Sequence, residues 1–381
     1  MNLHHRVSTA VYLICLVYCT AALAQPAAPP AAGGLAASIK TGAQVDAAGK
    51  EAIKKFIADQ AKKLADPSPD VDKSGRDLLI SESRVGGQMP GPAYASEYSK
   101  ALAAEMTNLL VGSASPRTKL IAAVVIGKVA ESLHDRGIEK AITALLNERH
   151  EALQLWGIKA AKAILPELVT VSGEGPVINA IVAAVKMHPS GPMFQEAFDA
   201  LMPHGLPPAK AGAFVGGLHA LLHLRLDTYK VKIPEDPEKD YLPFNFLKDN
   251  WTAMPPAQQV ETMQLLCDML TLAAAHGDNP NNRLMRDQFQ NIVVQGAGAL
   301  FVIANTIGNA PLVTAAQNAN KMAKGVAGGL GAAVAPLCQA ISAVKGFEKI
   351  KPPEFTPPTM APTTNPSAAP APAAPVVAPA K

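Results

Sequence analysis

The chain has 381 residues, of which 49% are hydrophobic, so it can bury a sizeable core. Its 34 Lys and Arg residues nearly balance its 31 Asp and Glu residues, which leaves a net charge of +3 and no clustered basic run. This balance argues against a nucleic-acid-binding protein, which concentrates positive charge on one face. Aromatic residues make up only 5%, which is low for a surface that stacks on bases or sugars.

The first 24 residues have the pattern of a secretory signal peptide. Arg6 precedes an apolar run that ends in the small-residue pattern Ala22-Leu23-Ala24. We therefore expect cleavage between Ala24 and Gln25 and export to the periplasm or the extracellular space. An uncleaved membrane anchor is the alternative interpretation of residues 1–24.

Two segments have the composition of linkers rather than of a folded core. Residues 25–37 are rich in Pro, Ala and Gly, and 18 of the 30 residues of 352–381 are Pro or Ala. Such segments hold too few large apolar side chains to pack, so we expect a flexible linker and a disordered, partly polyproline-like tail.

Between these segments the sequence predicts an all-α fold, because apolar residues recur at helical spacing and never alternate as in a strand. Most prolines fall between the predicted helices, Pro166 among them, whereas Pro336 should kink or split the last one. An irregular connector at 230–250 predicts a boundary between a domain at 38–229 and one at 251–351. The predicted helices cover 45–64, 76–83, 95–110, 117–133, 137–147, 150–164, 176–187, 192–202, 207–229, 256–275, 281–307, 311–324 and 326–345.

The front domain contains three helix pairs with a shared pattern, within about residues 95–203. A double aliphatic pair such as Leu145-Leu146 ends the first helix, and small or apolar residues line the second. The first two copies align with an offset of 35 residues, which places Ala122, Ile126 and Val129 opposite Gly157, Ala161 and Ile164. These features resemble HEAT repeats. The resemblance implies a short antiparallel helix-pair array at 38–229 that binds proteins or peptides and carries no catalytic residues; a non-repetitive helical bundle is the alternative.

The back domain, 251–351, contains long uncharged stretches. No charged side chain occurs in 288–320 or in 325–344, and Gly and Ala are frequent in both. The sequence predicts helices that pack closely through small residues, whose amide side chains then need hydrogen-bond partners. The alternative is a membrane-associated protein that acts through 288–345.

One helix carries a candidate metal site. His219 and His223 are four residues apart on a single face, and Asp227 continues the same stripe. Two imidazoles and a carboxylate suit zinc or another transition metal, so a metal-dependent enzyme is one hypothesis. Ala220 stands where zinc proteases carry their general base, and histidines that only pack in the core are the alternative.

After removal of the signal, Cys267 and Cys338 are the remaining cysteines, and they could form one disulfide or stay as buried thiols. Trp156 is a candidate anchor for a binding partner, with core packing as the alternative. The leading interpretation is an exported, non-enzymatic helical scaffold that needs no cofactor and binds a protein or peptide of the cell envelope.

Overall fold

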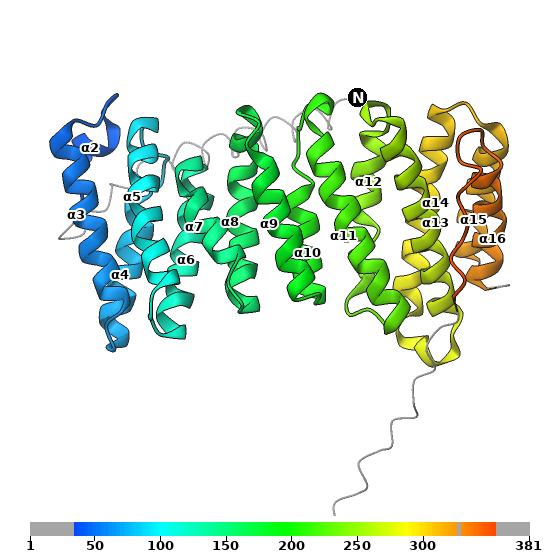
Figure 1. Ribbon diagram of the computed structural model, residues 1–381, viewed down its shortest axis with the longest axis horizontal. Coiled ribbons are helices and arrows are strands. Elements are labelled where there is room, and N and C mark those ends of the chain that lie inside the picture. Colours follow the sequence, from blue (N-terminus) through cyan, green and yellow to red (C-terminus); the bar gives the residue numbers. More distant parts are fainter. Residues whose placement is uncertain (1–33, 326–328, 356–381) are drawn as a thin grey trace, which may run out of the picture. The chain divides into compact units, whose positions relative to one another are not determined.

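Helices form all the regular secondary structure of the computed structural model, which describes residues 34–325 and 329–355 (Figure 1). Within these residues there is no strand, only an isolated bridge between Val85 and Gln88. The prediction of an all-α fold is therefore confirmed. The predicted signal peptide, 1–24, lies outside the described residues.

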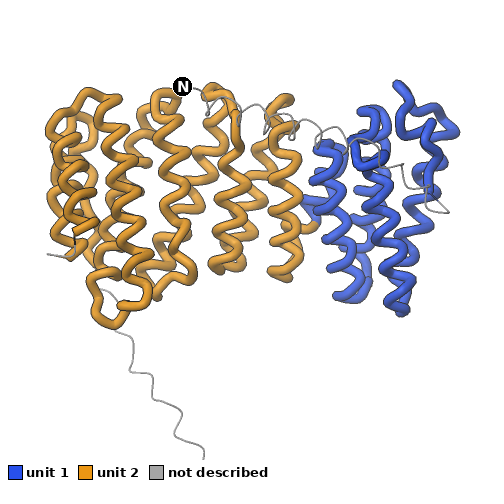
Figure 2. The backbone as a smooth tube through the Cα atoms, turned by 180° about the vertical axis from the view of Figure 1, so that it is seen from behind, with its two compact units in different colours: residues 1–144 blue, residues 145–381 orange. Residues whose placement is uncertain are grey.

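The chain divides into two compact units, residues 1–144 and 145–381 (Figure 2). The division falls well before the predicted boundary at 230–250, because helix packing continues through that connector. The helices that lie within the first unit are α2 (Ala37–Thr41), α3 (Ala47–Leu64), α4 (Pro69–Glu82), α5 (Pro92–Val111) and α6 (Pro116–Leu133), with the short 3-10 helix η1 (Arg136–Ile138). Helix α7 (Glu139–Leu146) contains the division itself.

The second unit contains the remaining helices. They are α8 (Glu151–Thr170), α9 (Glu174–Met187), α10 (Gly191–Leu201), α11 (Gly212–Val231), α12 (Leu242–Asp249), α13 (Pro256–Asp278), α14 (Arg286–Thr306), α15 (Ala310–Lys324) and α16 (Leu330–Ser342). Short 3-10 helices lie between them: η2 (Pro208–Lys210), η3 (Pro237–Lys239), η4 (Trp251–Ala253) and η5 (Pro280–Met285).

Within each unit a helix packs both on its neighbour and on the helix two places further along. In the first unit α3 contacts α5, and α4 contacts α6. In the second unit α8 contacts α10, α9 contacts α11, α11 contacts α13, and α12 contacts α14. Odd and even helices therefore form two layers as far as α14. Beyond it the order changes: α15 packs on α14 and α16, and α16 packs back on α13.

Local sequence signals explain where many helices begin. A polar side chain accepts a hydrogen bond from a backbone N–H of the first turn and so satisfies a donor that has no helical partner. The residues with this role include Asp46, Ser115, Ser190 and Asn309. Proline fits the first turn because its missing N–H has no acceptor there, as at Pro92, Pro116 and Pro256.

The prediction that a helix ends before Pro166 is wrong, because α8 continues through this residue to Thr170. Pro336 does not split its helix, since α16 continues through it as one helix. Each proline removes one backbone hydrogen bond, but the residues beyond it are buried, such as Leu168 and Ile341. Burial of these side chains offsets the lost bond.

The connector 230–250 is more regular than predicted. It holds α12, whose Phe244 and Leu247 are buried, and a charged network fixes the loop before it. Arg225 Nε on α11 donates to Asp240 Oδ2 at 2.8 Å, and Tyr229 Oη donates to the same oxygen at 2.8 Å. These three side chains are buried, so the ion pair between Arg225 and Asp240 joins the connector to the core.

The close packing predicted for the back half is present. A Cβ on Gly277 would lie 2.6 Å from Leu330 Cδ1, and a Cβ on Gly296 would lie 2.6 Å from Leu270 Cδ2. Gln290 Nε2 donates to the Ala323 carbonyl at 2.6 Å, whereas the buried Gln288 Oε1 has no hydrogen-bond partner among the described residues. The small residues therefore allow helix axes to approach closely.

The predicted linkers are ordered where they meet the helices. Leu35, near the end of the predicted linker 25–37, is buried, and its backbone N donates to Glu82 Oε2 at 3.0 Å. Residues 352–355 of the predicted tail are also described, and Phe355 packs against His276. An apolar side chain in each segment explains why packing extends beyond the predicted boundary. The rest of both segments lies outside the described residues.

Candidate functional site

The predicted metal ligands are not brought together. His219 and His223 lie on α11, with His219 buried and His223 exposed. Asp227 is exposed, and its Oδ1 lies 3.1 Å from Lys230 Nζ. In residues 34–325 and 329–355, no group of three His, Cys, Asp or Glu side chains is placed to hold a metal ion.

A carboxylate from another helix lies between the two histidines instead. Glu261, in the second turn of α13, places Oε1 3.1 Å from His223 Nε2 and Oε2 3.1 Å from His219 Nδ1. Helical spacing gives no signal for Glu261, because it identifies only neighbours on the same helix, and Glu261 is 38 residues beyond His223. This contact joins α11 to α13.

His219 makes a second polar contact with α13. Its Nε2 lies 2.8 Å from Thr262 Oγ1. Burial lowers the pKa of His219, and the neighbouring Glu261 carboxylate opposes that shift. Thr, His and Glu are the groups of a nucleophile, a base and an orienting carboxylate, but Thr262 is fully buried. The cluster therefore holds two helices together and does not present a nucleophile to solvent.

The structure brings the two predicted cysteines together. Cys267 on α13 and Cys338 on α16 are free, buried thiols, and Cys338 Sγ lies 3.8 Å from the Cys267 carbonyl oxygen. Thr271 Oγ1 donates to the same carbonyl at 2.8 Å and lies 3.7 Å from Cys338 Sγ. The interaction between the two cysteines raises the pKa of Cys267 and lowers the pKa of Cys338, and both thiols are buried. Neither thiol is therefore a reactive surface thiolate.

Trp156 lies on α8 and is half-buried. The ammonium of Lys159 lies 5.5 Å from the centre of its ring, a cation–π distance, and also 3.4 Å from Glu196 Oε1. The indole thus combines an apolar surface with an adjacent charge. This combination suits the role of partner anchor that the sequence predicts for it.

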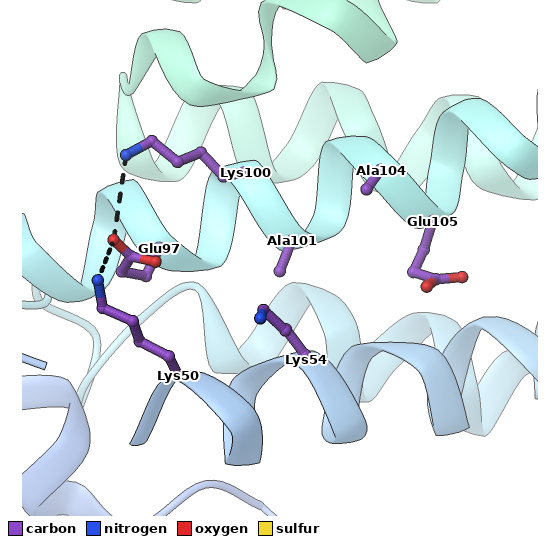
Figure 3. Close-up of a pocket in the computed structure, with 7 residues that line it drawn as sticks. All are labelled: Lys50, Lys54, Glu97, Lys100, Ala101, Ala104 and Glu105. Atoms are coloured by element: carbon purple, nitrogen blue, oxygen red, sulfur yellow. Dashed lines mark ion pairs between the residues drawn. The ribbon is translucent and has the colours of Figure 1, made fainter. Parts of the chain in front are cut away.

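A shallow groove lies between α3 and α5 in the first unit (Figure 3). Glu97 Oε1 lies 3.1 Å from Lys50 Nζ and 4.0 Å from Lys100 Nζ, so two of the lysines are paired within the groove. The cavity measures about 270 Å³ and is lined by Lys50, Lys54, Glu97, Lys100, Ala101, Ala104 and Glu105. Its charges nearly cancel, which gives it no strong preference for an anion or a cation.

A segment without regular helix follows α16 and lies along α13; we call residues 343–355 the strap (Figure 1). The Phe347 ring lies 6.2 Å from that of Trp251, just before α13 begins. Gln264 Nε2, in the middle of α13, donates to the Lys351 carbonyl at 2.9 Å. The Phe355 ring lies 5.4 Å from that of His276, in the last turn of α13. The strap therefore runs parallel to α13 along its length.

The far end of the strap contacts an aromatic cluster. His276 stacks on Phe289 at 5.5 Å, and Tyr229 meets both rings edge-on. His276 Nε2 lies 2.8 Å from the Tyr229 carbonyl oxygen, which fixes the imidazole. Phe355 thus adds a ring to a preformed aromatic surface. No local sequence pattern predicts this aromatic cluster, because its rings come from separate helices.

None of the helices in the described residues is both long and apolar enough to cross a membrane. No family model, curated protein or solved structure matches the chain.

Proposed function

We propose that the protein is an exported, non-enzymatic scaffold whose stacked helices bind an extended segment of a partner protein. The observation that carries the proposal is the strap: the surface of α13 holds a non-helical segment of the chain itself, with turns up to Ile350 and no further turn to Phe355, through two aromatic side chains and one backbone carbonyl. A surface that holds such a segment in cis has the groups needed to hold one in trans.

The chemistry of the strap indicates what the partner segment looks like. Pro352 and Pro353 stand between the two anchors, and consecutive prolines favour a preformed extended backbone that loses little entropy on binding. Extended proline-containing segments dock on aromatic surfaces in this way. Gln264 donates to a backbone carbonyl rather than to a side chain, so it can form this hydrogen bond with segments of different sequence. We therefore expect a proline-containing segment with aromatic anchors.

Two further features support a scaffold. The helix pairs of residues 95–203 resemble HEAT repeats, which typically bind proteins or peptides. Trp156, with Lys159 beside its ring, offers a second anchor on α8. The pattern of residues 1–24 supports export, so the partner would belong to the cell envelope. N-terminal sequencing of the protein from its cells tests this part: a mature chain that begins at Gln25 is expected, and an intact N-terminus would contradict export.

A peptide competition tests the binding function. The probe is a fluorescent peptide with the sequence of residues 345–360, titrated into the full chain and into the double variant Phe347→Ala/Phe355→Ala. The intact strap competes at an effective concentration on the order of millimolar, so the wild-type chain should bind the probe about tenfold or more weakly than the variant. Anisotropy gives both affinities.

The controls separate binding from misfolding. A peptide with both phenylalanines replaced by alanine should not bind, and the variant should retain a cooperative melt by circular dichroism. If the folded variant binds the probe no better than the wild type, or binds the alanine peptide equally well, α13 is not a peptide-binding surface. In envelope extracts, a partner should then be captured more strongly by the variant than by the wild type.

A further inference from the structure

The contact between α13 and α16 places the cysteines of two distant segments side by side. Cys267 and Cys338 are 71 residues apart in sequence, and both are fully buried at this contact. Cys338 Sγ lies 3.8 Å from the Cys267 carbonyl oxygen, and Thr271 Oγ1 contacts that oxygen at 2.8 Å and Cys338 Sγ at 3.7 Å. They are the only free cysteines among residues 34–325 and 329–355. A sulfur of one cysteine that lies this close to the backbone of the other brings the two residues within the short range that a disulfide needs.

We propose that Cys267 and Cys338 form a disulfide that covalently joins α13 to α16 in the exported protein. The oxidising location rests on the proposed function, whereas the pairing rests on the geometry alone. In the reaction both S–H bonds break and one S–S bond forms. The two protons and two electrons pass to an external disulfide, either a thiol–disulfide oxidoreductase or a small-molecule disulfide, which is reduced to two thiols.

Burial determines when the bond forms and how long it lasts. Neither sulfur is accessible in the folded chain, so oxidation occurs during folding or when α16 opens locally. Once α16 closes on α13, the same burial shields the bond from reductants. These properties are those of a structural disulfide rather than of an exchanging redox pair.

The position of the link has a consequence for the proposed peptide surface. The closed loop contains α14 and α15, and the strap leaves directly from the end of α16. The Trp251 and Gln264 contacts of the strap lie on or beside α13. A bond between α13 and α16 therefore fixes the root of the strap relative to the surface on which it lies.

Peptide mapping of the full chain tests the pairing. The purified protein is unfolded and refolded in a buffer of oxidised and reduced glutathione, alkylated in denaturant and digested with trypsin. Trypsin cleaves after Lys248, Arg283, Lys324 and Lys345, so Cys267 lies in peptide 249–283 and Cys338 in peptide 325–345. We expect these two peptides to be linked without reductant and separate with it. Two alkylated peptides, or a link to Cys15 or Cys19, would overturn the pairing.

A thermal melt gives an independent readout. A link that closes a loop of this length should raise the melting temperature by roughly 10 °C over that of the reduced protein. The variant Cys338→Ala should melt near the reduced wild type and show no effect of reductant. Equal melts for oxidised and reduced wild type, with the peptides linked, would overturn the stabilising role. Mapping of the protein from its own cells then separates the two proposals: a link that forms in refolding but is absent there contradicts export and not the geometry.

Discussion

Adjacent glycines on α11 provide a matched pair of substitutions that tests the packing of the second unit. A Cβ on Gly217 would lie 2.6 Å from Ile178 Cγ2 and 2.9 Å from Leu201 Cδ1. Both neighbours are buried, and the branched Ile178 has little rotamer freedom in its helix. A Cβ on Gly216, in contrast, would have no atom within 4 Å outside its own helix backbone and immediate chain neighbours.

The magnitudes follow from these distances. In a helix interior, replacing Gly by Ala stabilises by about 1 kcal/mol, and both sites gain this amount. Only Gly217→Ala must also push side chains apart in a filled core, which costs about 1–3 kcal/mol. The helix contribution cancels between the two variants, so Gly217→Ala should be about 1–3 kcal/mol less stable than Gly216→Ala.

Urea unfolding, followed by circular dichroism, measures this difference. The free energy of unfolding should rise for Gly216→Ala and fall below that value for Gly217→Ala, with unchanged m-values for both. If the two variants agree within about 0.5 kcal/mol, which is the usual scatter for neutral surface substitutions, α11 does not approach Ile178 and Leu201 as described. The two-layer packing of these helices would then be incorrect.

Other predictions concern polar contacts of the second unit. Asp278 accepts hydrogen bonds from the backbone N–H groups of Leu330 and Gly331, both at 2.7 Å. Asp278→Ala should therefore lower the free energy of unfolding by about 1–2 kcal/mol and speed hydrogen exchange in the first turn of α16. Unchanged exchange would show that Asp278 does not cap this helix. Burial lowers the pKa of His219, so below about pH 6.5 the unfolded chain binds a proton at this residue more readily than the folded chain does. The free energy of unfolding should therefore decrease as the pH is lowered below that value. His219→Gln should flatten this dependence between pH 7 and 5, and an equally steep curve would refute it. Because His219 and His223 are engaged with Glu261, added zinc should not change the melting temperature, whereas a shift that His223→Ala abolishes would establish a metal site.

Helix positions were predictable because they depend on local patterns. The apolar period, the polar caps and most prolines identify where helices begin and end, and the all-α fold follows from them. Pro166 and Pro336 show the limit of local reasoning. The loss of one backbone hydrogen bond is visible in the sequence, but the burial of Leu168 and Ile341 that offsets it depends on neighbouring helices.

The connector 230–250 also depends on tertiary contacts that its local sequence does not reveal. Its prolines and charges predict an irregular segment, yet Asp240 finds Arg225 and Tyr229 on α11 inside the core. A charged residue in a sequence normally indicates a solvated position. Only the tertiary contact changes this interpretation, and it also explains why the chain does not divide at the connector.

The candidate sites show the same difference between patterns within one helix and contacts between helices. The trio of His219, His223 and Asp227 was inferred from spacing within one helix, but the carboxylate that meets the histidines is Glu261 on α13. The strap depends likewise on Phe355 reaching an aromatic surface formed by separate helices. In a fold made of stacked helices, polar and aromatic sites form between helices rather than along them. Contacts between helices therefore carry the functional information in such a chain, and the contacts between α13 and the strap are the basis of the proposed peptide-binding surface.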